Sequence, residues 1–225
     1  MAGTHGAEAR PDGTVREVRI GPVGLEGLLG VPPEAKGVVV FAHGSGSSRL
    51  SPRNNHVAEA LRQAGLATLL FDLLLPQEVA DRSNVFDIGL LAERLLAATG
   101  WLRERPGTRH LTVGYFGAST GAAAALVAAA RAPASIRAVV SRGGRPDMAG
   151  AVLPEVAAPT LLIVGGDDLA VLDLNRAAFD RLQCEKRLEI VPRAGHLFEE
   201  PGTLEVVIEL ARAWFVMHLH GEAAA

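Results

Sequence analysis

The sequence is poor in cysteine, in net charge and in long apolar runs. It has a single cysteine among 225 residues, which excludes an internal disulfide framework and a zinc site built from several cysteines. Its formal net charge is only −3, so no global field attracts nucleic acid or an anionic membrane surface. No stretch reaches the roughly 18 uninterrupted apolar residues of a membrane span, and the polar N-terminus lacks the apolar core of a signal peptide. These absences predict a soluble cytoplasmic protein with no nucleic-acid or membrane partner.

The composition is that of a folded globular chain. It is 48% hydrophobic and 21% charged, and the length suits one medium-sized domain with a substantial core. No internal repeat, low-complexity linker or break in composition divides the sequence. We therefore expect a loose tail over residues 1–14 and a single domain over residues 15–225.

Short apolar, β-branched segments alternate with segments of helical period. We expect helices over residues 55–64, 86–102, 122–130 and 202–218, and strands over residues 15–20, 24–32, 37–44, 67–72, 111–117, 138–144, 160–166 and 187–192. The first two strands alternate polar and apolar residues around a Gly-Pro turn, which favours an antiparallel edge pair. The remaining pattern predicts an α/β fold, with a mostly parallel central sheet and helices on both faces.

Polar residues follow several of these strands at their carboxyl ends, where open parallel sheets form their sites. One such segment is GASTG at residues 117–121, which fits the G-x-S-x-G pattern of a nucleophile elbow. The strand-to-helix turn is so tight that a side chain at Gly117 or Gly121 would collide with backbone. An ordinary Gly-Ser turn is the alternative, but the position between a buried strand and an alanine-rich helix favours Ser119 as a nucleophile.

A serine hydroxyl needs a base, and the base needs a carboxylate. His196 follows the last strand in a glycine-containing loop and comes late in the chain, as the order Ser, Asp, His requires. Asp167 and Asp168 follow an earlier strand, between Ser119 and His196 in sequence. We favour Asp168, one step further into the loop, with Asp167 as the alternative.

Stabilisation of a developing oxyanion requires preorganised N–H donors. The backbone N–H of Thr120, directly after the candidate nucleophile, is one expected donor. The second is expected from the loop after residues 37–44, where we favour the N–H of Ser45, with Gly46 next. His43 in the same loop is expected to be structural.

Four motifs in this order, HGSGS, GASTG, GGDD and AGH, make the chain resemble an α/β-hydrolase over nearly all of residues 15–219. Within that superfamily it is similar to dienelactone-hydrolase-like proteins and small serine esterases. It departs from the dienelactone hydrolases in two ways, since they carry a cysteine where Ser119 stands and an acidic residue in the loop where HGSG stands here. These departures argue against their particular lactone chemistry.

The resemblance implies a serine hydrolase that cleaves a small carboxylic ester or thioester through a Ser119–His196–Asp168 triad and an acyl-enzyme, with no cofactor and no metal. The alternative is a non-catalytic binding protein of the same fold, whose pocket captures a small molecule without turnover.

The segment from residue 141 to residue 158, where lids of this fold usually enter, is too short for a helical cap. We therefore expect a minimal lid or none. Four arginines flank the expected site, and the hypothesis is that some of them line its entrance and favour an anionic substrate: Arg49, Arg53, Arg142 and Arg145. The alternative is that they are solvated or paired with acidic residues such as Asp72, Asp81 and Asp147.

Overall fold

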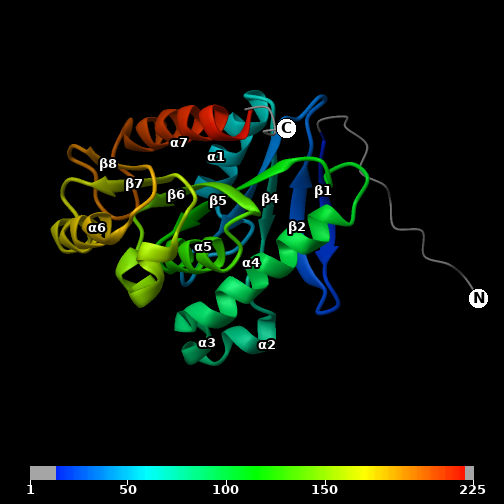
Figure 1. The fold of residues 1–225 in the computed structure, drawn as a ribbon, viewed down its shortest axis with the longest axis horizontal. Helices are drawn as coiled ribbons and strands as arrows, with labels where there is room; N and C mark the ends of the chain where they lie inside the picture. The colour runs from blue at the N-terminus through cyan, green and yellow to red at the C-terminus, as the bar shows by residue number, and fades with distance from the viewer. Residues whose placement is uncertain (1–13, 221–225) are drawn as a thin grey trace, which may run out of the picture.

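The computed structural model describes residues 14–220, so the predicted tail lies outside the described residues except for Thr14. Its centre is one eight-stranded sheet with the strand order β1-β2-β4-β3-β5-β6-β7-β8 (Figure 1). The strands are β1 (Val15–Ile20), β2 (Leu25–Gly30), β3 (Gly37–Ala42), β4 (Leu66–Phe71), β5 (Thr112–Ala118), β6 (Ile136–Arg142), β7 (Thr160–Gly165) and β8 (Lys186–Val191).

The sheet is parallel from β4 to β8, and β2 pairs antiparallel with both of its neighbours. This confirms the predicted parallel sheet with an antiparallel edge. Strands β3, β4 and β7 are buried at every residue, as expected for continuous apolar runs covered on both faces. In this arrangement the carboxyl ends of β3 and β5 to β8 meet along one edge.

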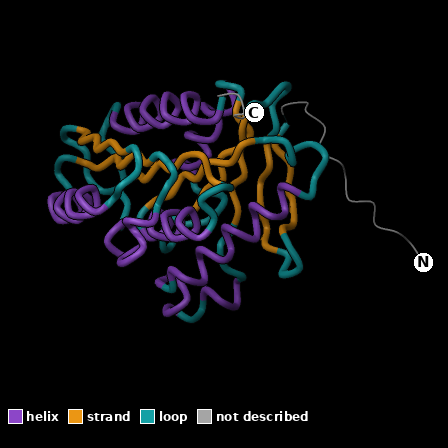
Figure 2. Tube along the Cα trace, in the orientation of Figure 1, coloured by secondary structure: helices purple, strands orange, loops and turns teal. Residues whose placement is uncertain are grey.

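Helices cover both faces of the sheet (Figure 2). Helices α1 and α7 pack against one face, where they share an apolar cluster with alternate residues of the central strands. The larger cluster on the other face includes residues of α4, α5 and α6. The helices are α1 (Pro52–Gln63), α2 (Pro76–Val79), α3 (Arg82–Phe86), α4 (Ile88–Arg103), α5 (Thr120–Arg131), α6 (Leu169–Arg181) and α7 (Thr203–Leu219), with the 3-10 segment η1 at Pro146–Glu155.

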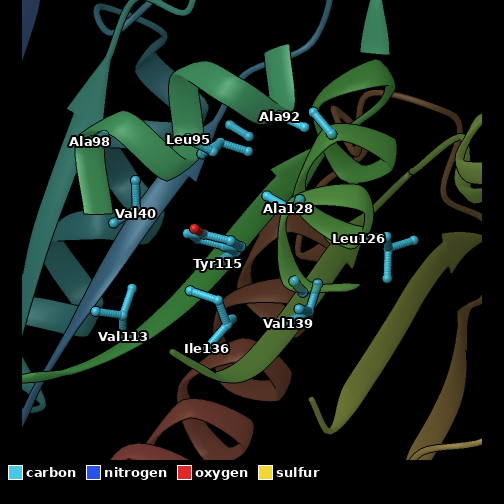
Figure 3. Close-up of a cluster of buried hydrophobic side chains, with 14 of the residues drawn as sticks. Val40, Ala92, Leu95, Ala98, Val113, Tyr115, Leu126, Ala128, Ile136 and Val139 are labelled. Carbon is cyan, nitrogen blue, oxygen red and sulfur yellow. The ribbon is translucent and has the colours of Figure 1, made fainter. Parts of the chain in front are cut away.

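The alanine-rich helix α5 lies at the centre of the larger cluster, and its first ten residues are all buried. Its small side chains let the helix approach the sheet closely, beside Tyr115 of β5 (Figure 3). The Tyr115 hydroxyl lies 2.7 Å from the hydroxyl of Thr99 on α4, and burial raises the pKa of Tyr115. The core therefore holds α5, and with it the residue that precedes α5, in a rigid position.

The starts of two helices differ from the sequence-based expectation because of the residues that cap them. Helix α1 begins at Pro52 rather than at residue 55, because the Ser51 hydroxyl accepts a hydrogen bond from Asn54 N–H and caps the helix. The expected helix over residues 86–102 is divided at Asp87, whose carboxylate accepts from Leu90 N–H and starts α4.

The predicted absence of a cap after β6 is confirmed, since that segment forms only the short 3-10 turns of η1. Helices α2 and α3, which follow β4, line part of a cavity next to the site. Glu78 of α2 is paired with Arg94 of α4 at 2.7 Å, and this ion pair ties the two short helices to the body of the domain.

Candidate active site

Ser119 occupies the sharp turn between β5 and α5. Its backbone has φ 50° and ψ −122°, a region that a non-glycine residue adopts only where the surroundings impose it. Its N–H donates to the carbonyl of Arg142 at 3.4 Å, and its own carbonyl accepts from the N–H of Arg145 at 3.0 Å. Ser119 is half-buried, so the strained turn presents its side chain at the carboxyl edge of the sheet.

Three glycines around Ser119 are required by close backbone approach. A Cβ at Gly117 would lie 2.4 Å from the Cα of Ala122, and a Cβ at Gly121 would lie 2.1 Å from the carbonyl oxygen of Ala42. Both contacts bear out the reason expected for the glycines of the pattern. The third glycine is Gly44, where a Cβ would lie 2.9 Å from the Cβ of Ser119. The HGSG loop therefore passes directly beside the serine.

His196 and Asp168 meet across the ends of two neighbouring strands. The imidazole Nδ1 of His196 lies 2.7 Å from Oδ2 of Asp168, so the ring donates its Nδ1 proton to the carboxylate and leaves Nε2 free to accept one. The side chain of His196 is 39% exposed and that of Asp168 is 16% exposed. Asp167 is exposed, and among the described residues only its backbone N–H is engaged, as a donor to the Ala194 carbonyl at 3.0 Å. The geometry favours Asp168 over Asp167 as the carboxylate partner of His196.

The expected N–H donors near Ser119 are all available. Within residues 14–220, the N–H groups of Thr120, Ser45 and Gly46 enter no turn, loop or cap hydrogen bond with another backbone group. Thr120 is the first residue of α5, where N–H groups have no partner inside the helix and the helix dipole is positive. Ser45 and Gly46 lie in the adjacent loop, and Gly46 has φ +71°.

His43 is a structural residue, as expected from the sequence. Leu73 N–H donates to its Nε2 at 3.2 Å, and its Nδ1 lies 2.9 Å from the carbonyl of Gly44. The neutral ring therefore carries its proton on Nδ1 and joins the ends of β3 and β4. Burial lowers the pKa of His43, against smaller opposing effects of the Gly44 carbonyl and of Asp72. The ring thus holds the HGSG loop in place without being free for proton transfer.

Two cavities share the loop at residues 44–48. The first, of about 600 Å³, has an apolar wall from the segment after β4, including Leu73, Leu74 and Val85, and it also reaches Thr120. The second, of about 570 Å³, is lined by Ser119, His196 and Arg142 among others. The candidate nucleophile and base therefore open into one cavity, and a cavity with an apolar wall lies on the other side of the loop.

The four arginines of the sequence-based hypothesis differ in their surroundings. Arg49 lines the first cavity but is engaged by Asp72 and by Glu26. The other three are distributed as follows: Arg53 and Arg142 line the second cavity, whereas Arg145 lines neither cavity and is paired bidentately with Asp147. Arg53 is paired with Glu199 at 2.6 Å. The ion-pair alternative therefore describes Arg49, Arg53 and Arg145, and Arg145 is not brought to the site.

Sequence reasoning missed two features of the site. Gly44 was not singled out, although a glycine in a loop after a buried central strand is a signal of close backbone approach. Asn54 was not identified either, because its buried contact with Arg142, from Nη2 to Oδ1 at 3.3 Å, joins residues 88 positions apart. Such a contact has no local signature.

Within residues 14–220, no group of three or more histidine, cysteine, aspartate or glutamate side chains is arranged to hold a metal ion. None of the helices in the same range has the length and apolar character needed to cross a bilayer.

The chain matches known proteins over nearly its whole length. The sequence profile of the Dienelactone hydrolase family matches residues 25–214. A dienelactone hydrolase from Anabaena variabilis is 60% identical, with a TM-score of 0.88, over 92% of this chain and 97% of that structure. Two proteins from strains of Mycobacterium tuberculosis, provisionally named phosphoribosyl transferases, are also 60% identical over 222 residues. That match covers 98% of this chain but only 50% of theirs, so the chain spans about half the length of these relatives.

More distant structures share the fold. Est1E from Butyrivibrio proteoclasticus is 16% identical, with a TM-score of 0.77 over 92% of this chain and 99% of that one. An α/β serine hydrolase without a lid from Xanthomonas campestris is 22% identical, with a TM-score of 0.74 over 93% of this chain and 97% of that one. These matches confirm the predicted α/β-hydrolase fold with a minimal lid.

Proposed function

Because the chain belongs to the dienelactone hydrolase family, an α/β-hydrolase family of esterase type, we propose that it is a serine hydrolase acting on a small carboxylic ester or thioester. The observation that carries the proposal is the 2.7 Å contact between His196 and Asp168, placed in a cavity that His196 shares with Ser119.

The first half-reaction acylates Ser119. His196 Nε2 accepts the Ser119 hydroxyl proton as Oγ attacks the substrate carbonyl carbon, and a tetrahedral intermediate forms. Asp168 keeps the Nδ1 proton in place and stabilises the imidazolium. When the intermediate collapses, the bond to the leaving oxygen or sulfur breaks and His196 returns its proton to that atom.

The second half-reaction releases the acid. Water loses a proton to His196 and attacks the acyl carbon, and Ser119 leaves as its hydroxyl after His196 returns the proton. In both intermediates the negative oxygen is held by the N–H groups of Thr120 and Ser45, which are free of other backbone bonds among the described residues. The positive end of α5 adds to this stabilisation.

The experiment is active-site labelling of the purified chain with a fluorophosphonate probe, together with hydrolysis of 4-nitrophenyl acetate. We expect wild type to be labelled and to hydrolyse the ester, and Ser119→Ala to lose both while keeping its Tm. Ser135→Ala is the matched control, because Ser135 immediately precedes β6 and so lies near the opposite edge of the sheet. Folded wild-type protein that takes no label would contradict the proposal and support a binding protein of the same fold.

A further inference from the structure

Arg142 is a buried cation without a carboxylate partner. It ends β6, and only 7% of its surface is exposed. Within residues 14–220 it makes no ion pair; its Nη2 donates to Asn54 at 3.3 Å, and its Nε is buried without any hydrogen-bond partner. Burial, helped by the nearby charge of Arg53, lowers the pKa of Arg142 to about 10. The guanidinium is therefore still protonated at neutral pH.

Two neighbouring arginines, unlike Arg142, are paired with carboxylates. Arg53 is paired with Glu199 at 2.6 Å, and Arg145 with Asp147 at 2.8 Å. Burying a charge without a counter-charge is strongly unfavourable, and removing such a cost requires a partner anion. In the described part of the chain no acidic side chain fills this role at Arg142.

Arg142 lies on the His196 side of the cavity. The next residue, Gly143, approaches His196 so closely that a Cβ there would be 2.9 Å from the His196 carbonyl oxygen. The Arg142 guanidinium also lies 6.0 Å from the ring centre of Phe198 in the same loop as His196. Because His196 must protonate the leaving atom, the leaving group occupies this side of Ser119.

The cavity beyond the loop at residues 44–48 has a mixed lining and does not reach Ser119 or His196. Leu73, Leu74 and Val85 give it an apolar wall, and charged side chains line it as well: Arg19, Glu26, Arg49 and Asp72. Its two arginines are paired with these acids, and Arg53 of the second cavity is paired with Glu199. Among the described residues, Arg142 is therefore the cavity-lining arginine that has no carboxylate partner.

We propose that Arg142 is a specificity-determining residue that binds an oxyanion, a carboxylate or a phosphate, on the leaving group of the substrate. This inference rests on the serine hydrolase function proposed above. The Arg142 side chain lines the cavity that contains Ser119 and His196, and a planar guanidinium can donate two parallel hydrogen bonds to such a group. The natural substrate class is then an ester or thioester with an anionic alcohol or thiol part.

The test compares 4-acetoxybenzoate with methyl 4-acetoxybenzoate, two acetate esters that differ in the charge of the leaving group. We expect the ratio of their kcat/KM values, anionic over neutral, to fall on the order of 10- to 100-fold in Arg142→Gln, the worth of one lost charge-assisted hydrogen-bond pair. Arg142→Lys should recover part of the ratio. Arg137→Gln is the matched control, because Arg137 lies exposed at the opposite end of the same strand and should leave the ratio unchanged.

Competitive inhibition of wild type separates the two sources of the oxyanion and does not depend on a folded variant. Benzoate should inhibit at least tenfold more strongly than neutral benzamide if the site takes a carboxylate, and phenyl phosphate should do so if it takes a phosphate. Equal inhibition by all three compounds, or an unchanged ratio in folded Arg142→Gln, would overturn the proposal. Labelling of Ser119 by the fluorophosphonate in the same samples keeps this failure distinct from a failure of the hydrolase function.

Discussion

The closest backbone approach at the site involves Gly121, the second residue of α5, and it yields a quantitative prediction. A Cβ in Gly121→Ala would lie 2.1 Å from the carbonyl oxygen of Ala42 and 2.6 Å from that of His43. Ordinary van der Waals contact begins at 3.4 Å, so the shorter distance is too small by more than 1 Å. Both opposing atoms belong to the backbone of the segment at the end of β3, and neither can rotate away as a side chain would.

The overlap must be relieved by moving α5 away from the end of β3. Overpacking of this kind costs about 1–3 kcal/mol of the free energy of unfolding, and the better helix propensity of alanine offsets less than about 1 kcal/mol of it. We expect the Tm of Gly121→Ala to fall by roughly 2–10 °C for a domain of this size. Because the movement separates Thr120 from the loop that carries Ser45, kcat/KM for 4-nitrophenyl acetate should fall about 100-fold.

Differential scanning calorimetry and steady-state kinetics measure the two effects. Gly100→Ala is the control, because Gly100 lies exposed in α4 and a Cβ there meets nothing within 4 Å. That variant should be equally stable or up to about 1 kcal/mol more stable than wild type, with unchanged activity. If Gly121→Ala behaved like Gly100→Ala in both assays, the described approach of α5 to the end of β3 would be wrong.

Two further predictions concern the carboxylate partner of His196 and the structural residue His43. Asp168→Asn should lower kcat about 10⁴-fold with little change in Tm, because an amide cannot hold His196 in the required tautomer. In the same steady-state assay, the kcat of Asp167→Asn should remain within about twofold of the wild-type value. Similar losses of kcat in both variants would refute the assignment of Asp168 as the carboxylate. For His43, burial lowers the pKa in the folded state, so below about pH 6.5 the unfolded chain binds the proton more readily and stability falls as the pH decreases. The loss of Tm between pH 7 and pH 5 should therefore be smaller in His43→Gln, whose amide oxygen can still accept from Leu73 N–H, and an equal loss in both proteins would exclude His43 as a source of acid sensitivity.

The local parts of the site were predictable from the sequence. The glycine at 117 follows from the steric demand of a strand-to-helix turn, because a Cβ there would meet Ala122, which is close in the chain. The pattern also predicts the glycine at 121, although the backbone that a Cβ there would meet belongs to the distant end of β3. The order of Ser119, Asp168 and His196 along the chain, each after a buried strand, was sufficient to propose that they meet at one sheet edge. The structure places Asp168 and His196 2.7 Å apart and places His196 in the cavity that contains Ser119.

The partners of charged side chains were not predictable in this way. The sequence does not distinguish between the four arginines near the expected site, Arg49, Arg53, Arg142 and Arg145. In the structure, three of them are paired with carboxylates. Helices α2 and α3 were also missed, because short helices that hold their position through a contact such as Glu78 with Arg94 have little periodicity of their own.

The sequence by itself determined the class of fold, the strained turn at Ser119 and the identity of its candidate base, because backbone sterics and strand order depend on local residue types and their succession. Only the tertiary structure decided which acidic residue faces His196, which glycine touches the serine, and which arginine stays without a counter-charge beside it. Those outcomes depend on distances between segments that the packed sheet brings together, and such distances are set by the whole core rather than by any one stretch of the chain.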